Sequence, residues 1–128
     1  MSVPAELKYT EEHLWMGVPE GGRARAGLTH FAQSQLGDIV YVELPQVGQV
    51  IEAGQAMGQV ESVKAATDFY APVGGKVTAV NQELAESPEL INEDPYADGW
   101  MVEIEPSGAD ATSHLLDAAK YQGLVAEG

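Results

Sequence analysis

The sequence predicts a mainly β protein built from many short strands. Fourteen glycines and seven prolines among 128 residues provide frequent turns, which favours short strands over a helical bundle. In two segments, 39–44 and 100–104, the side chains alternate with the period of two that a half-buried strand requires. An apolar fraction of 45% is ordinary for a globular protein, so we expect a folded core rather than disorder.

Strand-like runs follow one another along the chain, with turn signals between them. We expect strands at residues 7–9, 14–18, 23–28, 39–44, 49–52, 55–62, 67–70, 76–81 and 100–104, and a turn at 19–22. In the segment 39–44, alternation places Val40, Val42 and Leu44 on one face of the strand. In the segment 100–104, alternation separates Val102 from Met101.

Two helices are expected beside the strands. Thr29 is a suitable N-cap for a two-turn helix that Gly37 ends. Residues 110–122 form the second helix, with Leu115 and Ala119 on one face, and its weak periodicity suits a helix lying on the surface. No linker or low-complexity tract divides the chain. We therefore expect one domain over 1–128, with a core at about 7–106 and a helical appendage at about 110–122.

Charge and composition exclude several classes of function. A net charge of −14 with only six basic residues argues against nucleic acid, because phosphate binding depends on Lys and Arg. The acidity serves solubility or attracts partners with basic faces. The chain has no cysteine, so any sulfur chemistry must come from an attached group. The first ten residues lack a basic start and an apolar stretch, and no apolar run reaches the ~18 residues of a membrane span. We expect a cytoplasmic monomer.

A faint internal repeat brackets one lysine. Pro-Gln-Val-Gly-Gln-Val at 45–50 is echoed by Pro-Val-Gly-Gly-Lys-Val at 72–77, and Lys64 lies between the copies, at equal distances from Gly54 and Gly74. Two related strand units that meet in a hairpin would put Lys64 at its tip. An exposed lysine is a poor nucleophile but is accessible to an enzyme that acylates it. Position alone favours an ordinary surface lysine over a modified one.

The wider sequence resembles a known family. Residues 61–68 read Glu-Ser-Val-Lys-Ala-Ala-Thr-Asp, and with 70–77 they resemble the lipoyl-lysine segment of glycine cleavage system H proteins. Blocks at 8–15, 27–40, 42–48 and 90–100 resemble the family in the same order, so the resemblance covers about 7–120. It implies a flattened barrel-sandwich hybrid of two antiparallel sheets, of the biotinyl/lipoyl-carrier type, with the modified lysine on a hairpin.

The resemblance also implies a function and a set of partners. Lipoate would be attached to Lys64 as an amide, on an arm that reaches on the order of ten ångströms or more. The arm would carry an aminomethyl group from a pyridoxal-phosphate glycine decarboxylase to a tetrahydrofolate-dependent aminomethyltransferase. An FAD-containing dihydrolipoamide dehydrogenase would reoxidise it, and a lipoate-attaching enzyme would modify the lysine. The protein itself would be a carrier without catalytic activity.

Further candidate site residues surround Lys64 in the sequence. For recognition by the modifying enzyme and for the hairpin they are Glu61, Ser62, Val63, Ala65, Gly54, Gly74 and Gly75. Glu61 resembles an acidic residue that modifying enzymes recognise, and it is equally compatible with an ordinary solvated carboxylate on a strand. Val63 and Ala65 are expected to shape the turn. The three glycines are expected at bends that a β-carbon would obstruct.

Two positions depart from the family pattern. Leu14 stands where the family commonly has an acidic residue, and His30 stands where it commonly has aspartate. In the family, polar groups near these places help to hold the loaded amine, and Glu11 or Glu12 is the nearby substitute. The histidines share no metal or triad spacing. Residues 92–99 resemble a calcium loop, but Tyr96 stands where an oxygen ligand is needed, so we expect no metal.

Other functions are weighed against this one. Biotin carriers typically flank the lysine with methionines, whereas Val63 and Ala65 flank it here. Lipoyl domains of 2-oxoacid dehydrogenases are shorter and usually follow flexible linkers. The sequence leaves open the alternative of an H-like protein that acts in lipoate relay. A hydrolase is not expected, because the chain lacks a nucleophile elbow, a P-loop and a ligand-spaced histidine cluster.

Overall fold

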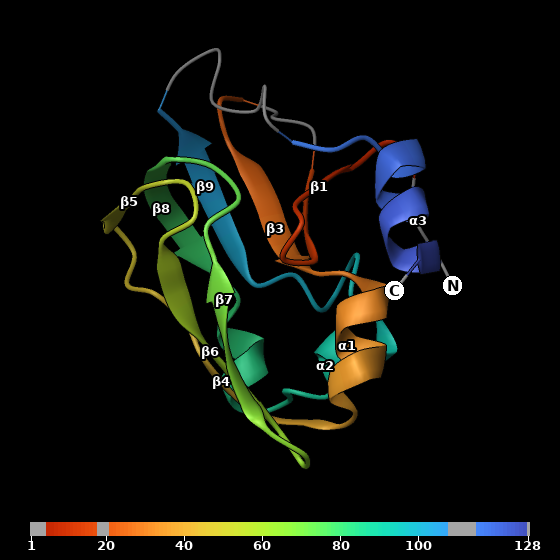
Figure 1. Ribbon diagram of the computed structural model, residues 1–128. Helices are drawn as coiled ribbons and strands as arrows, with labels where there is room; N and C mark the ends of the chain where they lie inside the picture. Colours follow the sequence, from red (N-terminus) through yellow and green to blue (C-terminus); the bar gives the residue numbers. More distant parts are fainter. Residues whose placement is uncertain (1–4, 18–20, 108–114, 128) are drawn as a thin grey trace.

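A computed structural model describes residues 5–17, 21–107 and 115–127 and contains two antiparallel sheets (Figure 1). The six-stranded sheet has the order β1-β2-β3-β9-β8-β5 and the three-stranded sheet has the order β4-β6-β7. The strands are β1 Lys8–Tyr9, β2 Leu14–Met16, β3 Ala24–Leu28, β4 Ile39–Glu43, β5 Val50–Ile51, β6 Ala56–Ser62, β7 Ala66–Tyr70, β8 Gly75–Val80 and β9 Val102–Pro106. The predicted mainly β fold of two antiparallel sheets with flanking helices is confirmed, and both sheets are open.

The described part of the chain also contains four short helical segments. They are α1 His30–Leu36, the 3₁₀ helix η1 Gln82–Ala85, α2 Leu90–Glu93 and α3 Ala118–Glu127. Thr29 caps α1 as predicted, since its hydroxyl accepts a hydrogen bond from the Ala32 amide at 3.1 Å. Gly37 ends α1 with a positive φ of 82°. None of the helices among the described residues has the length and apolarity needed to cross a bilayer.

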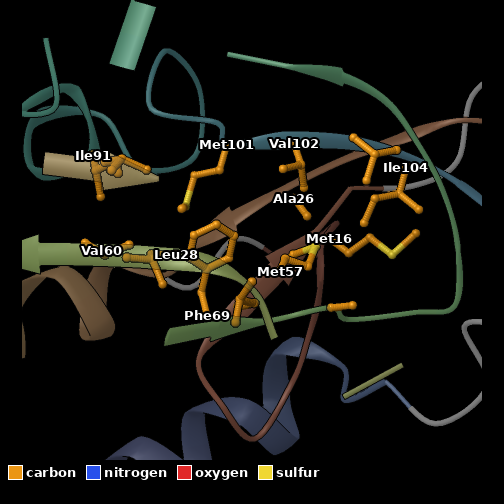
Figure 2. Close-up of a cluster of buried hydrophobic side chains, with 14 of the residues drawn as sticks. Met16, Ala26, Leu28, Met57, Val60, Phe69, Ile91, Met101, Val102 and Ile104 are labelled. Atoms are coloured by element: carbon orange, nitrogen blue, oxygen red, sulfur yellow. The ribbon is translucent and has the colours of Figure 1, made fainter. Parts of the chain in front are cut away.

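The hydrophobic core lies between the two sheets. Figure 2 shows Leu28, Val102 and Ile104 from the six-stranded sheet together with Val60 and Phe69 from the three-stranded sheet. These five side chains are at most 4% exposed. Each sheet buries one face against the other, and the tip of the β6–β7 hairpin extends past this core (Figure 1).

The two copies of the sequence repeat lie side by side. β5 pairs with β8, with Val50 opposite Lys76 and Ile51 opposite Gly75. The Gly48 amide donates to the Val77 carbonyl at 2.7 Å. The repeat thus forms one edge of the six-stranded sheet, and the β6–β7 hairpin is the segment between its copies.

The alternation predicted for two strands is wrong in detail. In β4 the register shifts between Ile39 and Tyr41, so Ile39 and Val42 are buried while Val40 is exposed. A bulge inserts one unpaired residue and breaks the alternation that the pattern assumed. Met101 is fully buried, because β9 begins only at Val102 and Met101 precedes its regular alternation.

The C-terminal helix begins later than predicted. Of the expected 110–122 segment, residues 110–114 lie outside the described residues, and α3 starts at Ala118. Leu116 instead forms a β-bridge with Tyr9, with both backbone hydrogen bonds at 2.8 Å, which holds this stretch extended. Tyr121 of α3 then stacks on Tyr9, with ring centroids 4.6 Å apart. The helix is therefore packed against β1 in a second, smaller apolar cluster.

Candidate functional site

Lys64 lies in the turn between β6 and β7, and its side chain is exposed. Glu61 and Ala66 are the last paired residues of the two strands. Ser62, Val63 and Ala65 complete the turn, so these four sequence-predicted residues are brought together with the lysine. Glu61 is half-buried, opposite Tyr41 of β4.

The turn is built around the Ser62 hydroxyl. Two-residue hairpin turns usually need positive φ angles and therefore Gly or Asn. The residues of this turn have no positive φ, because His13 is the only non-glycine residue with positive φ in the described part of the chain. Here the Ser62 Oγ accepts hydrogen bonds from the amides of Lys64 and Ala65, each at 3.2 Å. The Ser62 amide also donates to the Ala65 carbonyl at 2.8 Å. A serine side chain thus replaces the usual turn chemistry.

Replacing Ser62 with alanine is expected to loosen this turn. The Ser62→Ala variant loses the two hydrogen bonds that the hydroxyl accepts and the one that it donates to the Ala65 carbonyl at 3.2 Å. The free energy of unfolding should fall by about 1 kcal/mol. Urea unfolding measures the loss, and amide hydrogen exchange should accelerate at Lys64 and Ala65. Ser34→Ala is the matched control, because Ser34 is an exposed residue of α1 whose hydroxyl donates to the Phe31 carbonyl of the same helix at 2.8 Å. It should change stability by less than about 0.5 kcal/mol. Unchanged exchange at Lys64 in the Ser62 variant would contradict this role for the hydroxyl.

The hairpin tip is anchored to the end of α1. The Val63 amide donates to the Asp38 carbonyl at 3.1 Å. The stem of Lys64 lies over Gly37, where an added β-carbon would be 3.6 Å from Lys64 Cε. The backbone is therefore fixed on one side, while the lysine side chain remains accessible.

The three candidate glycines lie away from the lysine. Gly54, with φ of 83°, occupies the turn before β6, and its amide donates to the Ala71 carbonyl after β7, at the opposite end of the hairpin. A β-carbon on Gly75 would collide with the Glu105 carbonyl of β9, whereas one on Gly74 would make only ordinary contacts. Of the three glycines, only Gly75 lies where a β-carbon would be obstructed. Gly54 is required for a different reason, because its positive φ favours glycine.

An apolar cleft of about 420 Å³ lies between α1 and β7. Phe31, Leu36 and Phe69 contribute its apolar wall, and Glu12 and Asp68 contribute carboxylates. It adjoins the hairpin tip, because Leu36 precedes the Gly37 that Lys64 overlies. Sequence reasoning did not identify this cleft, although Asp68 belongs to the same short motif as Lys64.

The departures from the family pattern have distinct structural outcomes. Leu14 is 1% exposed and belongs to the core, so it does not line the cleft. The backbone amide of His30 donates to the Tyr96 hydroxyl at 3.0 Å. Of the two nearby acidic residues, Glu12 lines the cleft, whereas Glu11 lines a different pocket. Within the described ranges, no three His, Asp or Glu side chains converge as metal ligands.

One wall of the cleft is held by a hydrogen-bond chain to α3. His13 has a φ of 68°, a strained conformation for a non-glycine residue. Its Nδ1 lies 2.9 Å from the Tyr121 hydroxyl, which lies 2.7 Å from the Thr29 hydroxyl. Burial lowers the pKa of His13, with Glu12 opposing the shift, and burial raises the pKa of Tyr121 to about 12. The C-terminal helix therefore helps to position the cleft.

The lowered pKa of His13 predicts a pH dependence of stability. Because the folded-state pKa lies below the ordinary 6.5, the unfolded chain binds more protons at this residue as pH falls below about 6.5. Stability from His13 is complete above that value and declines as pH drops toward the folded-state pKa. Urea unfolding of the wild type and of His13→Asn, which tolerates positive φ, should show a stability difference that shrinks between pH 7.5 and about 5.5. A constant or growing difference would refute the shift.

Comparison with known proteins identifies the family to which the chain is similar. The family described as Glycine cleavage H-protein matches residues 7–128. The glycine cleavage system H proteins of Bacillus cytotoxicus and Halalkalibacterium halodurans are 55% and 52% identical over 125 and 126 residues, and in each case 98% of both chains is covered.

A solved structure extends the match to three dimensions. The crystal structure of a glycine cleavage system H protein from Mycobacterium marinum superposes with a TM-score of 0.89 at 36% identity, covering 97% of this chain and 99% of that one. Sequence and architecture therefore agree over almost the whole length, and the chain belongs to the glycine cleavage H-protein family.

Proposed function

We propose that this protein is the lipoyl carrier of a glycine cleavage system, with lipoate attached to Lys64. The observation that carries the proposal is the exposure of Lys64 at the tip of an anchored hairpin. A lysine in this position can enter the active site of another protein while the carrier itself stays folded. Family membership supports the same reading.

The residues around Lys64 fit an attached acyl arm. When bound, lipoate supplies a cyclic disulfide that can accept an aminomethyl group as it is reduced. Nζ of Lys64 would hold it as an amide, and the loss of the ammonium charge suits an arm that lies against apolar surface. The cleft beside α1 offers such a surface through Phe31 and Leu36.

The two carboxylates of the cleft suit a cationic cargo. Glu12 and Asp68 line the same cleft, and an amine at the end of a loaded arm is positively charged at neutral pH. Glu12 would thus hold the loaded amine, a role for which Leu14 is unsuited because it is buried in the core. The chain would bind and shelter the arm, and it would contribute no catalytic group of its own.

The partners follow from this function. They would be a pyridoxal-phosphate glycine decarboxylase, a tetrahydrofolate-dependent aminomethyltransferase, an FAD-dependent dihydrolipoamide dehydrogenase and a lipoate-attaching enzyme. A monomeric carrier in the cytoplasm could visit each in turn, because the tether keeps the cargo at a high effective concentration. The net charge of −14 would favour basic faces on these partners.

Reconstitution tests the proposal. The lipoylated protein is mixed with the decarboxylase, the aminomethyltransferase, the dehydrogenase, glycine, tetrahydrofolate and NAD⁺, and the reduction of NAD⁺ to NADH is followed. We expect glycine-dependent NADH formation that requires the lipoylated chain. If the lipoylated chain supports none, but donates its lipoyl group to a 2-oxoacid dehydrogenase in the presence of a transferase, a relay function replaces the proposed one.

A further inference from the structure

Three exposed apolar side chains lie on the Lys64 turn and on the strand that pairs beside it. Val40 is 52% exposed, Tyr41 is 50% exposed and Val63 is 67% exposed. Val40 and Tyr41 belong to β4, and Val63 belongs to the hairpin turn. We call these three residues the hairpin patch.

The hairpin patch results from a specific backbone feature. The bulge in β4 leaves Val40 unpaired between Ile39, opposite Ser62, and Tyr41, opposite Glu61. Two consecutive apolar side chains consequently face solvent, whereas regular alternation would bury one of them. Bulges of this kind often re-aim side chains near functional sites. β4 is also an edge strand of its sheet, so no further strand among the described residues pairs with its outer side.

The patch is continuous with the lysine and with a neighbouring hollow. The Val63 amide is bonded to the Asp38 carbonyl at 3.1 Å, which holds the turn beside the start of β4. On the other side, Tyr41 lines a hollow of about 510 Å³ formed between β4 and η1. A partner seated on the patch would therefore have a recess for one of its own side chains within reach of the hairpin.

The charges around the patch define its partner. Asp38, Glu43, Glu61 and Glu86 lie beside the patch or line the hollow. Apart from Lys64, the lysines and arginines of the chain lie on or beside β1, β3, β8 and α3. The complementary surface has an apolar centre and a basic rim, which suits a protein and excludes an anionic membrane or nucleic acid.

We propose that the hairpin patch is the docking surface for the enzyme that acylates Lys64, an inference that rests on the proposed carrier function. In that reaction the amide C–N bond forms at Nζ and the acyl C–O bond to an adenylate leaving group breaks. AMP departs, and the former ammonium releases two protons to solvent.

The short reach of the unmodified lysine singles out the acylating enzyme among the partners as the one that docks on the hairpin patch. The acyl carbon must come within bonding distance of Nζ, and an extended lysine places Nζ only about 6 Å from its Cα. The acylating enzyme therefore has to touch the hairpin body. Enzymes that receive the end of the finished arm can stay on the order of ten ångströms or more away, so they depend less on Val40, Tyr41 and Val63.

Acylation kinetics test the inference. The apo-protein is incubated with a lipoate–protein ligase, lipoate and Mg-ATP, and initial rates are measured across protein concentrations. Tyr41→Ser and Val63→Ser should each reduce kcat/KM by about tenfold, mainly through KM, because they remove uniform binding. Tyr41→Phe should retain the wild-type rate. Val50→Ser is the matched control, since Val50 is 74% exposed and belongs to β5, a strand that lies away from the tip of the β6–β7 hairpin in Figure 1.

Each outcome has a distinct meaning. Wild-type rates for both serine variants would overturn the docking inference, and so would an equal loss in Val50→Ser. Normal acylation of Tyr41→Ser followed by failure in glycine cleavage would assign the patch to another partner and overturn it as well. Absence of acylation at Lys64 in the wild type would instead remove the carrier function itself.

Discussion

Lys64→Arg is expected to abolish lipoylation and all glycine-cleavage activity while leaving the fold intact. Arginine keeps the positive charge and the long stem, but its guanidinium remains protonated and is not acylated under these conditions. Lys64 is exposed, so the substitution buries nothing and should change the free energy of unfolding by less than about 0.5 kcal/mol. Intact-mass measurement and the reconstituted assay give the two readouts.

A matched lysine separates the site from a general effect of charge. Lys76 is also exposed, but it lies on β8 within the sequence repeat. Lys76→Arg should be lipoylated and should support glycine cleavage at the wild-type rate. Residual activity of Lys64→Arg above the background without the chain would contradict the assignment of the arm to this residue.

Phe69→Ala is expected to cause a large loss of stability. Phe69 is 1% exposed and lies among core side chains from both sheets (Figure 2). Truncating it leaves a cavity that a close-packed core fills only partly, at a cost of about 3–5 kcal/mol. Urea unfolding at equilibrium measures the change as a shift of the midpoint.

An exposed residue provides the comparison for Phe69. Val50→Ala removes side-chain atoms from a position that is 74% exposed and should change stability by less than about 0.5 kcal/mol. A loss below about 1 kcal/mol for Phe69→Ala would mean that the sheets do not pack through this residue. Because Phe69 also lines the cleft beside α1, a surviving folded variant should have an enlarged cleft.

Local pattern predicted the strands better than their register. Strands over 39–44 and 55–62 follow from alternation and turn residues, which act over a few positions. The bulge at Val40 does not, because it depends on how β4 pairs with β6, whose partner residues lie far along the chain. The same limit explains Leu116, which is held extended by Tyr9 although its neighbourhood was expected to be helical.

The site divides in a similar way. The lysine and its turn could be predicted, because the motif and the hairpin are contiguous in sequence. The cleft could not, since it joins Glu12, Phe31 and Asp68 from separate elements. The contact between His13 and Tyr121 is likewise invisible to local pattern, because the positive φ of His13 and the packing of α3 exist only in the folded chain.

Peptide mapping by tandem mass spectrometry tests the central claim most directly. The protein is produced in cells able to attach lipoate, digested, and fragmented to locate the added mass. We expect a single lipoyl group on the peptide that contains residues 61–68, with fragment ions assigning it to Lys64. Modification of a different lysine, or none in a host that lipoylates its own carriers, would contradict the proposed function.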